Sequence, residues 1–303
     1  MIRKIFANSL ILALSFAAVV HAAENKQEIW EPTLPGPFTT FTAPLIEKSK
    51  FVMQPLYFFN MTRGTFDGDG SYNALPEKDY RYQQFIQLYT QYAPIERLEF
   101  NAQPQWKINY ARTDGATAEN AGFADFLMNV RWCPVDESYW CPRITPIFQV
   151  KLPTGKYQKA HPGKLGTDIT GTGSTDYTFG TSFTKGIKPV EWHLDALWTT
   201  SPSPVSIDGV KTEFSDQYII NGAFELVFYK KLNLMSELLW QSQGDRKEDG
   251  SWMSSTAKSS LKWAIGIGYS EQYWQVLFGY QRTLLGENED ADDTIAATII
   301  IIF

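Results

Sequence analysis

Histidine is the commonest general base in enzymes, and this chain has three, His21, His161 and His193. A hydrolase site built on a strand needs an imidazole that can take the proton of a hydroxyl, for example a His and a Ser two residues apart on one face. The residue two beyond His193 is Asp195, which is no nucleophile for that chemistry, and His161 falls in a polar loop. We therefore expect His193 to hydrogen-bond acidic neighbours in a protein that is not an enzyme, with a hydrolase as an alternative.

Two other spacings resemble chemical motifs. Cys133 and Cys141 bracket PVDESYW, and an even cysteine pair in an exported chain indicates a disulfide; the pair would stay reduced if this segment is not a turn on the oxidising side. Two cysteines without a nearby histidine do not make a usual zinc site. In LPTGKYQKAHPGKLG, Gly155 and Gly163 are too far apart for a Walker A phosphate loop. No metal ion and no cofactor is expected.

The two ends of the chain indicate export and membrane insertion. Residues 1–23 contain two basic residues, an apolar run and small residues in the order of a cleavable signal peptide. The terminal DTIAATIIIIF is too short for a spanning helix, which needs roughly 20 apolar residues, but a tilted strand crosses with about 9 to 11. The net charge of −6 lacks the basic excess of a nucleic-acid binder.

Alternation with period two runs through most of the chain. In EFNAQPQWKINY, Phe100, Trp106 and Tyr110 share one face, while Asn101 and Lys107 share the other. Successive side chains of a strand point to opposite faces, so each such segment predicts a strand with one apolar and one polar face. We expect about twelve strands, near residues 51–62, 80–93, 98–111, 121–132, 143–152, 174–185, 190–200, 215–229, 232–243, 258–270, 273–284 and 293–303.

The connections between these segments alternate in length. Short ones are APIER, KGIKPV, YKK and SEQ, whereas TRGTFDGDGSYNALPEKD, RTDGATAENA, PTGKYQKAHPGKLGTDITGTG, SPSPVSIDGVKTEF, QGDRKEDGSWMSSTA and LGENEDAD are long and polar. Bacterial outer-membrane barrels have an even strand number, short periplasmic turns and longer extracellular loops. The sequence therefore predicts an all-β fold, a transmembrane antiparallel up-and-down barrel over residues 51–303. A secreted sandwich, the alternative, does not explain the one-sided loop lengths.

The last strand would place Ile295, Ala297, Ile299, Ile301 and Phe303 against lipid. A terminal aromatic residue on such a strand resembles the assembly signal of bacterial outer-membrane proteins. That resemblance implies outer-membrane lipid and the barrel assembly machinery as partners, the latter through Phe303.

Charged residues on the inward faces are the candidate solute path. Strands three to five would carry mostly positive charge, and strands six to nine mostly negative charge. By parity the inward set is Lys107, Asp125, Arg131, Arg143, Lys151, Asp176, Glu191, His193, Asp195, Glu225 and Glu237. Opposed walls of this kind would either set a transverse electric field across a water-filled pore, or their charges would form ion pairs and close the pore.

Residues 24–50 contain WEPTLPGPFTTFTAPL, whose prolines argue against a regular strand. The segment could enter the barrel as a plug or lie in the periplasm, and the sequence does not choose between these placements.

The stretch FQVKLPTG, followed by a polar loop and GTGSTDYTFGTSFTK, resembles the signature region of the outer-membrane family labelled "MetA-pathway of phenol degradation". This resemblance implies a barrel that takes up aromatic or other hydrophobic compounds. We expect a passive outer-membrane channel for small molecules. A closed structural or adhesin-like barrel that acts through its loops is the alternative.

Overall fold

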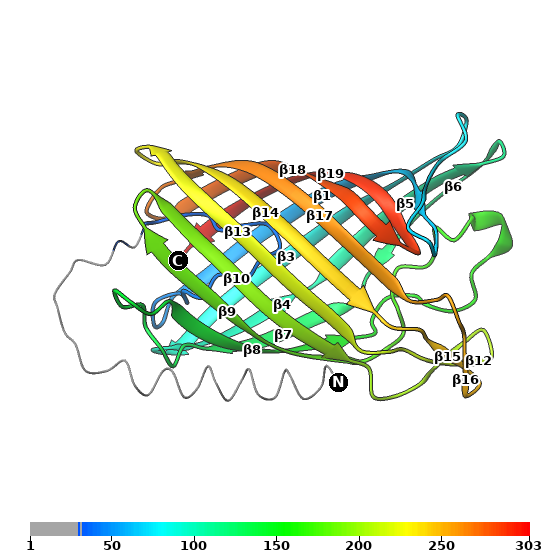
Figure 1. Ribbon diagram of the computed structural model, residues 1–303, viewed down its shortest axis with the longest axis horizontal. Helices are drawn as coiled ribbons and strands as arrows, with labels where there is room; N and C mark the ends of the chain where they lie inside the picture. The colour runs from blue at the N-terminus through cyan, green and yellow to red at the C-terminus, as the bar shows by residue number, and fades with distance from the viewer. Residues whose placement is uncertain (1–29, 31) are drawn as a thin grey trace.

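The computed structural model describes Trp30 and residues 32–303, so the predicted signal peptide lies outside the described residues. The regular secondary structure of the described residues is β-structure apart from one 3-10 turn, and the strands are wound into a barrel (Figure 1). The wall strands are β1 (Phe51–Phe66), β3 (Tyr80–Ile95), β4 (Leu98–Gln103), β5 (Gln105–Thr113), β6 (Ala116–Phe123), β7 (Phe126–Trp132), β8 (Arg143–Leu152), β9 (Asp176–Ile187), β10 (Val190–Thr200), β13 (Gln217–Tyr229), β14 (Leu232–Gln243), β17 (Lys258–Ser270), β18 (Trp274–Glu287) and β19 (Glu289–Ile302). The loops hold β2 (Tyr72–Ala74), β11 (Val205–Ile207), β12 (Val210–Glu213), β15 (Lys247–Glu248), β16 (Ser251–Trp252) and the 3-10 turn η1 (Pro162–Lys164).

Every wall strand pairs antiparallel with its neighbours, and β1 pairs with both β3 and β19, which closes the barrel. Two of the crossings are made of two pieces. Pro104 has no N–H for the ladder and separates β4 from β5, while Ala124 and Asp125 separate β6 from β7. Counting each of these pairs once gives twelve crossings in the described part of the chain, so the predicted strand number is confirmed.

The connections sort by length between the two ends of the barrel. Two-residue turns at 96–97, 188–189 and 230–231 lie at the end that also holds Phe51 and Phe303, which we call the short-turn end. The other end, the long-loop end, carries the connections 67–79, 153–175, 201–216 and 244–257. The four longest connections therefore lie at one end, as the sequence predicted, although the ten-residue connection 133–142 lies at the short-turn end, where the Cys133 N–H donates to the Arg97 carbonyl.

Two of the expected long loops are instead tight turns. Asp114 and Gly115 have φ values of 50° and 82°, so RTDGATAENA folds back directly and β5 and β6 project past the rim. An Asp-Gly pair with both φ values positive is the usual two-residue hairpin turn. In LGENEDAD a single residue, Asn288 with φ 49°, joins β18 to β19. Polarity predicted a loop in both places, but turn chemistry decided the length.

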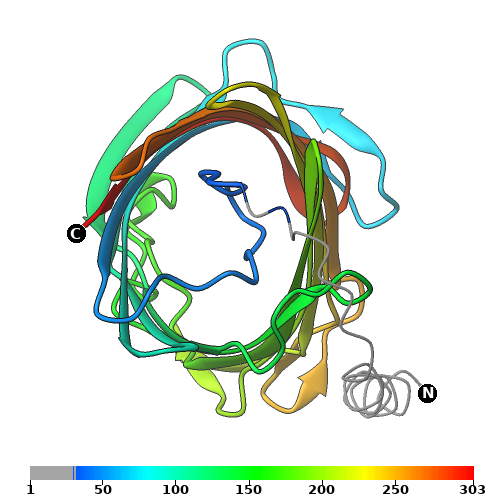
Figure 2. The same cartoon turned by 90° about the vertical axis from the view of Figure 1, so that its left-hand side faces the viewer.

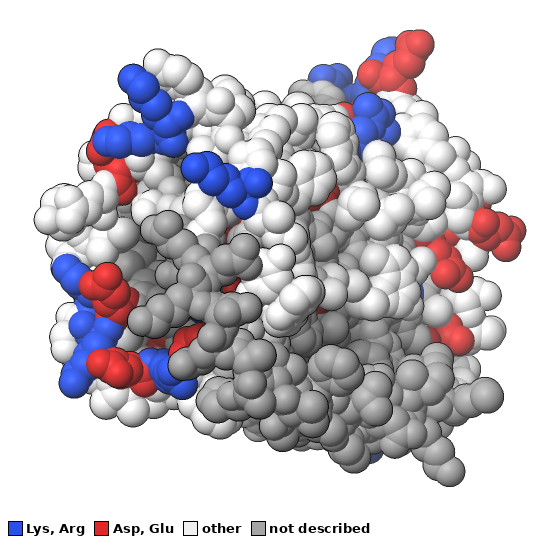
Figure 3. Space-filling model, turned by 60° about the vertical axis from the view of Figure 1, so that its left-hand side comes forward, with Lys and Arg blue, Asp and Glu red and all other residues white. Residues whose placement is uncertain are grey.

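The outer face of the barrel is apolar and the inner face is polar. Along β19, Ile295 and Ile299 are 37% and 38% exposed, whereas Ala296 and Ile300 are 2% and 8% exposed, so the predicted parity of this strand is confirmed. On the face visible in Figure 3, the charged side chains gather towards the two ends of the molecule. This distribution is typical of a barrel with an apolar lipid-facing band. No helix among the described residues is long and apolar enough to cross a membrane.

The segment before β1 lies inside the barrel. Viewed along the axis, the blue chain that leads into β1 runs within the ring of strands (Figure 2). Residues 32–50 have no helix or strand and are irregular apart from bends at 38–40 and 43 and a turn at 48–49, as their prolines predict. Of the two placements that the sequence left open for residues 24–50, the described part occupies the lumen, and we call residues 32–50 the plug.

The structure does not contain the expected disulfide between Cys133 and Cys141, because both cysteines are free. Cys133 Sγ points to the carbonyl of Val135 at 3.5 Å, while Cys141 pairs through its main chain with Ser138. A disulfide needs two Cβ atoms directed at each other, which spacing alone does not ensure. Burial raises the pKa of both thiols.

Candidate functional site in the lumen

The plug is held by the negatively charged side of the barrel that the sequence predicted for strands six to nine. These strands are β9, β10, β13 and β14, and we call their inner face the acidic wall. Oε1 of Glu237 on β14 accepts hydrogen bonds from the backbone N–H and the hydroxyl of both Thr39 and Thr40, at 2.5 to 3.1 Å. Asp195 Oδ2 on β10 accepts from the N–H of Phe41 at 2.7 Å. The Glu237 side chain is buried, and burying a carboxylate is costly unless it is hydrogen-bonded. The plug supplies the donors that these two carboxylates require.

The opposite side of the plug contacts a buried ion pair. Arg131 Nη1 on β7 lies 3.1 Å from Glu99 Oε1 on β4, and both side chains are almost fully buried. Arg131 also donates to the carbonyl oxygens of Thr42 and Pro44, and Glu99 Oε2 accepts from the N–H of Ile46 at 3.1 Å. Arg131 therefore anchors the plug in addition to facing the lumen.

Glu99 is an inward residue that the sequence analysis missed. It has the same parity as Asn101 on β4, so the alternation that identified Asn101 as inward already indicated that Glu99 also points inward. Its 0% exposure reflects the plug above it and the cation beside it.

The predicted opposed walls meet where β8 lies beside β9. There Lys151 forms an ion pair with Asp176, and its Nζ lies 3.9 Å from Asp125. Lys107 Nζ lies 5.3 Å from the centre of the Phe85 ring, and Arg143 lines the cavity described below. Charges of opposite sign are thus paired at this boundary. The carboxylates of Asp195 on β10 and Glu237 on β14 instead accept hydrogen bonds from N–H groups of the plug.

His193 has the acidic neighbours predicted for it. Its Nε2 lies 3.2 Å from Glu225 Oε2 on β13 and 3.5 Å from Glu191 Oε2 on its own strand. Its Nδ1 lies 2.9 Å from the hydroxyl of Thr184 on β9. The sequence pattern did not indicate this hydroxyl, because Thr184 reaches His193 across a strand pair. Thr184 is 0% exposed and accepts a hydrogen bond from the N–H of Ala43 in the plug, so the plug covers this hydroxyl.

A cavity of about 780 Å³ remains between the plug and the wall. Its lining combines carboxylates, glutamines and aromatic rings. Members of this lining are Phe38, Phe41, Phe58, Gln87, Tyr89, Gln91, Glu99, Gln103, Arg131, Arg143, Glu191 and Glu225.

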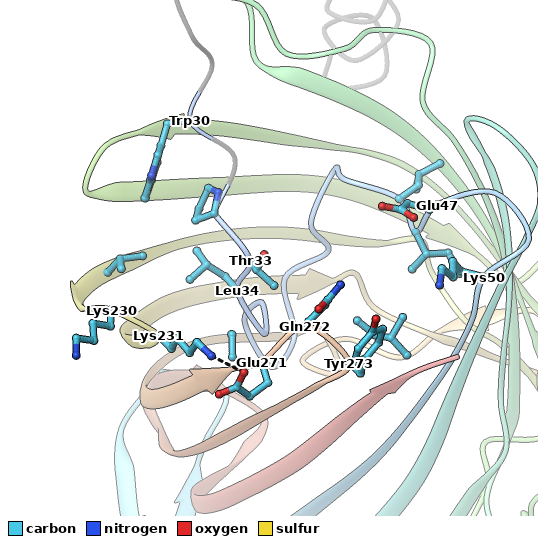
Figure 4. A pocket seen from close by; sticks show the side chains of 16 residues that line it. Trp30, Thr33, Leu34, Glu47, Lys50, Lys230, Lys231, Glu271, Gln272 and Tyr273 are labelled. Carbon is cyan, nitrogen blue, oxygen red and sulfur yellow. Dashed lines mark hydrogen bonds and ion pairs between the residues drawn. The ribbon is translucent and has the colours of Figure 1, made fainter.

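A second cavity, of about 810 Å³, lies at the short-turn end between the plug and the turns (Figure 4). Trp30 and Leu34 line it from the side of the plug, and Tyr273 lines it from the turn after β17. At its edge Lys231 donates a hydrogen bond to Glu271, which lowers the pKa of that carboxyl. The mouth of the barrel is therefore hollow.

The stretch that carries the family resemblance forms the base of the 153–175 loop. Asp125 accepts from the N–H of Gly155 at 3.1 Å and from the N–H and hydroxyl of Thr172, both at 2.9 Å. A Cβ on Gly171 would lie 2.4 Å from Asp125 Oδ1 and 2.8 Å from the backbone of Gly155. Glycine is required where two backbones and a carboxylate approach this closely. Asp125, predicted on the solute path, closes this loop.

Comparison with solved structures identifies the architecture. An outer membrane channel from Pseudomonas putida F1 superposes with a TM-score of 0.71 at 13% identity, over 86% of this chain and 97% of that chain. The fold is that of an outer-membrane β-barrel. The beta domain of the Bordetella autotransporter BrkA (TM-score 0.48, 7% identity, 84% of this chain and 100% of that one) and the NanC porin (0.47, 8%, 83% and 98%) also match. Scores below 0.5 add nothing to this assignment. No known family model and no curated relative matches the chain.

Proposed function

We propose that the protein is a passive channel of the bacterial outer membrane that admits small molecules. The observation that carries this proposal is the cavity of about 780 Å³ inside a closed barrel with an apolar outer face. A ligand site is typically concave, about 300 to 1,000 Å³, and lined by apolar groups with a few placed polar groups. The likeness to the Pseudomonas putida channel supports the fold on which the proposal rests.

We further propose solutes that combine an aromatic ring with polar groups. Phe38, Phe41, Phe58 and Tyr89 supply ring faces to the cavity, and Gln87 supplies an amide. This composition agrees with the sequence resemblance to the family labelled "MetA-pathway of phenol degradation", in which we place the chain as part of the same proposal. No catalytic step and no cofactor is part of it.

The test is flux through the refolded protein in lipid. Planar-bilayer currents under a salt gradient would report conductance and charge preference, and swelling of proteoliposomes would compare benzoate and benzyl alcohol with arabinose. We expect discrete currents and faster entry of the aromatic compounds. A folded barrel with neither current nor swelling contradicts the channel, whereas entry of arabinose at the same rate contradicts only the solute class.

A closed structural barrel is the second candidate, and the plug is the observation that favours it. The plug is fixed to β7, β10 and β14 by the contacts above. In that case the protein acts through the long loops, and removal of residues 32–48 would leave its partner binding unchanged while deletion of residues 156–170 abolished it. The bilayer measurement separates the two candidates.

A further inference from the structure

The acidic wall contains a compact set of metal-ligating atoms. One ligand atom each from Glu191, His193 and Glu225 can be chosen so that all lie within 4.8 Å of one another. These three residues are 7%, 2% and 0% exposed. Three oxygen and nitrogen atoms at this separation can share one metal ion.

The strand register places two like charges directly opposite each other. Glu191 on β10 is the register partner of Glu225 on β13, and His193 is two residues further along the same face. Carboxylates directly opposite in a sheet repel each other, and the cost rises when they are buried. A cation between them removes the repulsion, and a dication does so for both charges.

Neighbouring hydrogen bonds already orient the three side chains. The Nδ1 atom of His193 is occupied by the Thr184 hydroxyl at 2.9 Å, which leaves Nε2 facing the carboxylates. Glu225 Oε1 accepts from Asn233 Nδ2 at 2.5 Å, which directs Oε2 towards His193. Outer hydrogen bonds of this kind fix the tautomer and the orientation of metal ligands.

The rest of the wall is also short of positive partners. Asp195 Oδ1 and Glu237 Oε2 are buried without a hydrogen-bond partner in the described part of the chain. Glu191 and Glu225 line the 780 Å³ cavity, so a hydrated ion has a place from which to enter. The site therefore has both a reason to attract a cation and a path for it.

We propose that Glu191, His193 and Glu225 bind a divalent transition-metal ion of the zinc type. One imidazole nitrogen and carboxylate oxygens suit Zn²⁺, and three protein ligands leave a position for water or for an anionic group of a solute. The sequence did not indicate this site, because Glu225 lies far along the chain from the Glu191 and His193 pair that it joins. The proposal does not depend on solute flux.

The experiment uses the folded full-length barrel in detergent, treated with a chelator and then desalted. Zn²⁺ is titrated against a chromophoric indicator, and bound metal is counted by mass spectrometry. We expect about one ion per chain. His193→Gln and Glu225→Gln should each bind Zn²⁺ at least about tenfold more weakly, because losing a ligand should cost more than losing an outer hydrogen bond, which weakens metal binding about 10- to 100-fold. His161→Gln is the matched control, because His161 lies in the 153–175 loop, where its side chain caps η1, so binding should be unchanged.

Spectroscopy of the wild type keeps the proposal testable if a variant fails to fold. X-ray absorption at the zinc edge reports the atoms bound to the ion and needs no reagent to reach the buried His193. We expect one imidazole nitrogen together with carboxylate oxygens. Stoichiometric binding retained in folded His193→Gln, absence of binding to the folded wild type, or a bound zinc ion without an imidazole ligand would each overturn the metal site.

Discussion

Replacement of Glu237 by alanine should release the plug from the acidic wall. This carboxylate accepts four hydrogen bonds through one oxygen, from Thr39 and Thr40. A hydrogen bond to a charged group contributes about 1.5 to 3 kcal/mol net. Because the lumen gives the freed donors some access to water, we count the loss of one such bond only. The ratio of docked to undocked plug should then fall about 10- to 150-fold, since about 1.4 kcal/mol is a factor of ten.

The assay is single-channel recording in planar bilayers, with wild type, Glu237→Ala and the control Glu213→Ala compared at one salt concentration. Glu213 is a carboxylate of the loop sheet that pairs with Lys247 at 3.7 Å and does not touch the plug. We expect longer or larger openings in Glu237→Ala, approaching those of a barrel that lacks residues 32–48, and wild-type behaviour in the control. Wild-type currents in Glu237→Ala, with large currents after removal of residues 32–48, would refute the role of Glu237 as the anchor.

Three further outcomes are expected. Glu99→Gln alone should lower the free energy of unfolding, measured by urea titration, by about 3 to 5 kcal/mol, because it leaves Arg131 buried without its charged partner. The double variant Glu99→Gln with Arg131→Gln should recover much of that loss. If the loss in the double variant equals the sum of the two single losses, the two residues are not coupled. Iodoacetamide at pH 8 should label Cys141 before Cys133. Burial raises the pKa of both thiols and so lowers the fraction of reactive thiolate, and Cys133 is the more deeply buried of the two and so less accessible to the reagent. Equal labelling rates by mass spectrometry would count against this difference in burial. Removal of Phe303 should reduce the amount of heat-modifiable barrel in cells, because this residue closes the seam through a 2.9 Å hydrogen bond from its N–H to the Phe51 carbonyl; unchanged assembly would contradict its role.

Strand positions were the most predictable part of this molecule, because each side of the wall meets a different solvent. Along β19 the alternation of Ile295 and Ala296 follows directly from lipid outside and protein inside. The ends of strands were less predictable. At Asp114 and Asn288 the backbone adopts positive φ and turns at once, which composition alone does not reveal.

The candidate site was predictable only as a set of inward residues. Parity identified Glu237 and Arg131 as facing inward, yet their partners Thr39, Thr40 and Thr42 come from the plug, whose irregular backbone has no period to follow. The same holds for Thr184, which touches His193 from the next strand. Direction can be read from a strand pattern, whereas contacts between distant segments depend on the register and on what fills the interior.

The docking of the plug also bears on how long the folded barrel survives. Its hydrogen bonds to Thr184, Asp195 and Glu237 join residues 141 to 198 positions apart in the chain. Because these three partners lie on β9, β10 and β14, the plug can dock against all of them only after these strands have paired. Interactions that are absent from the transition state slow unfolding and leave the folding rate nearly unchanged. The plug should therefore act as an internal brace that lengthens the lifetime of the assembled barrel, and truncated barrels should unfold faster while refolding at the wild-type rate.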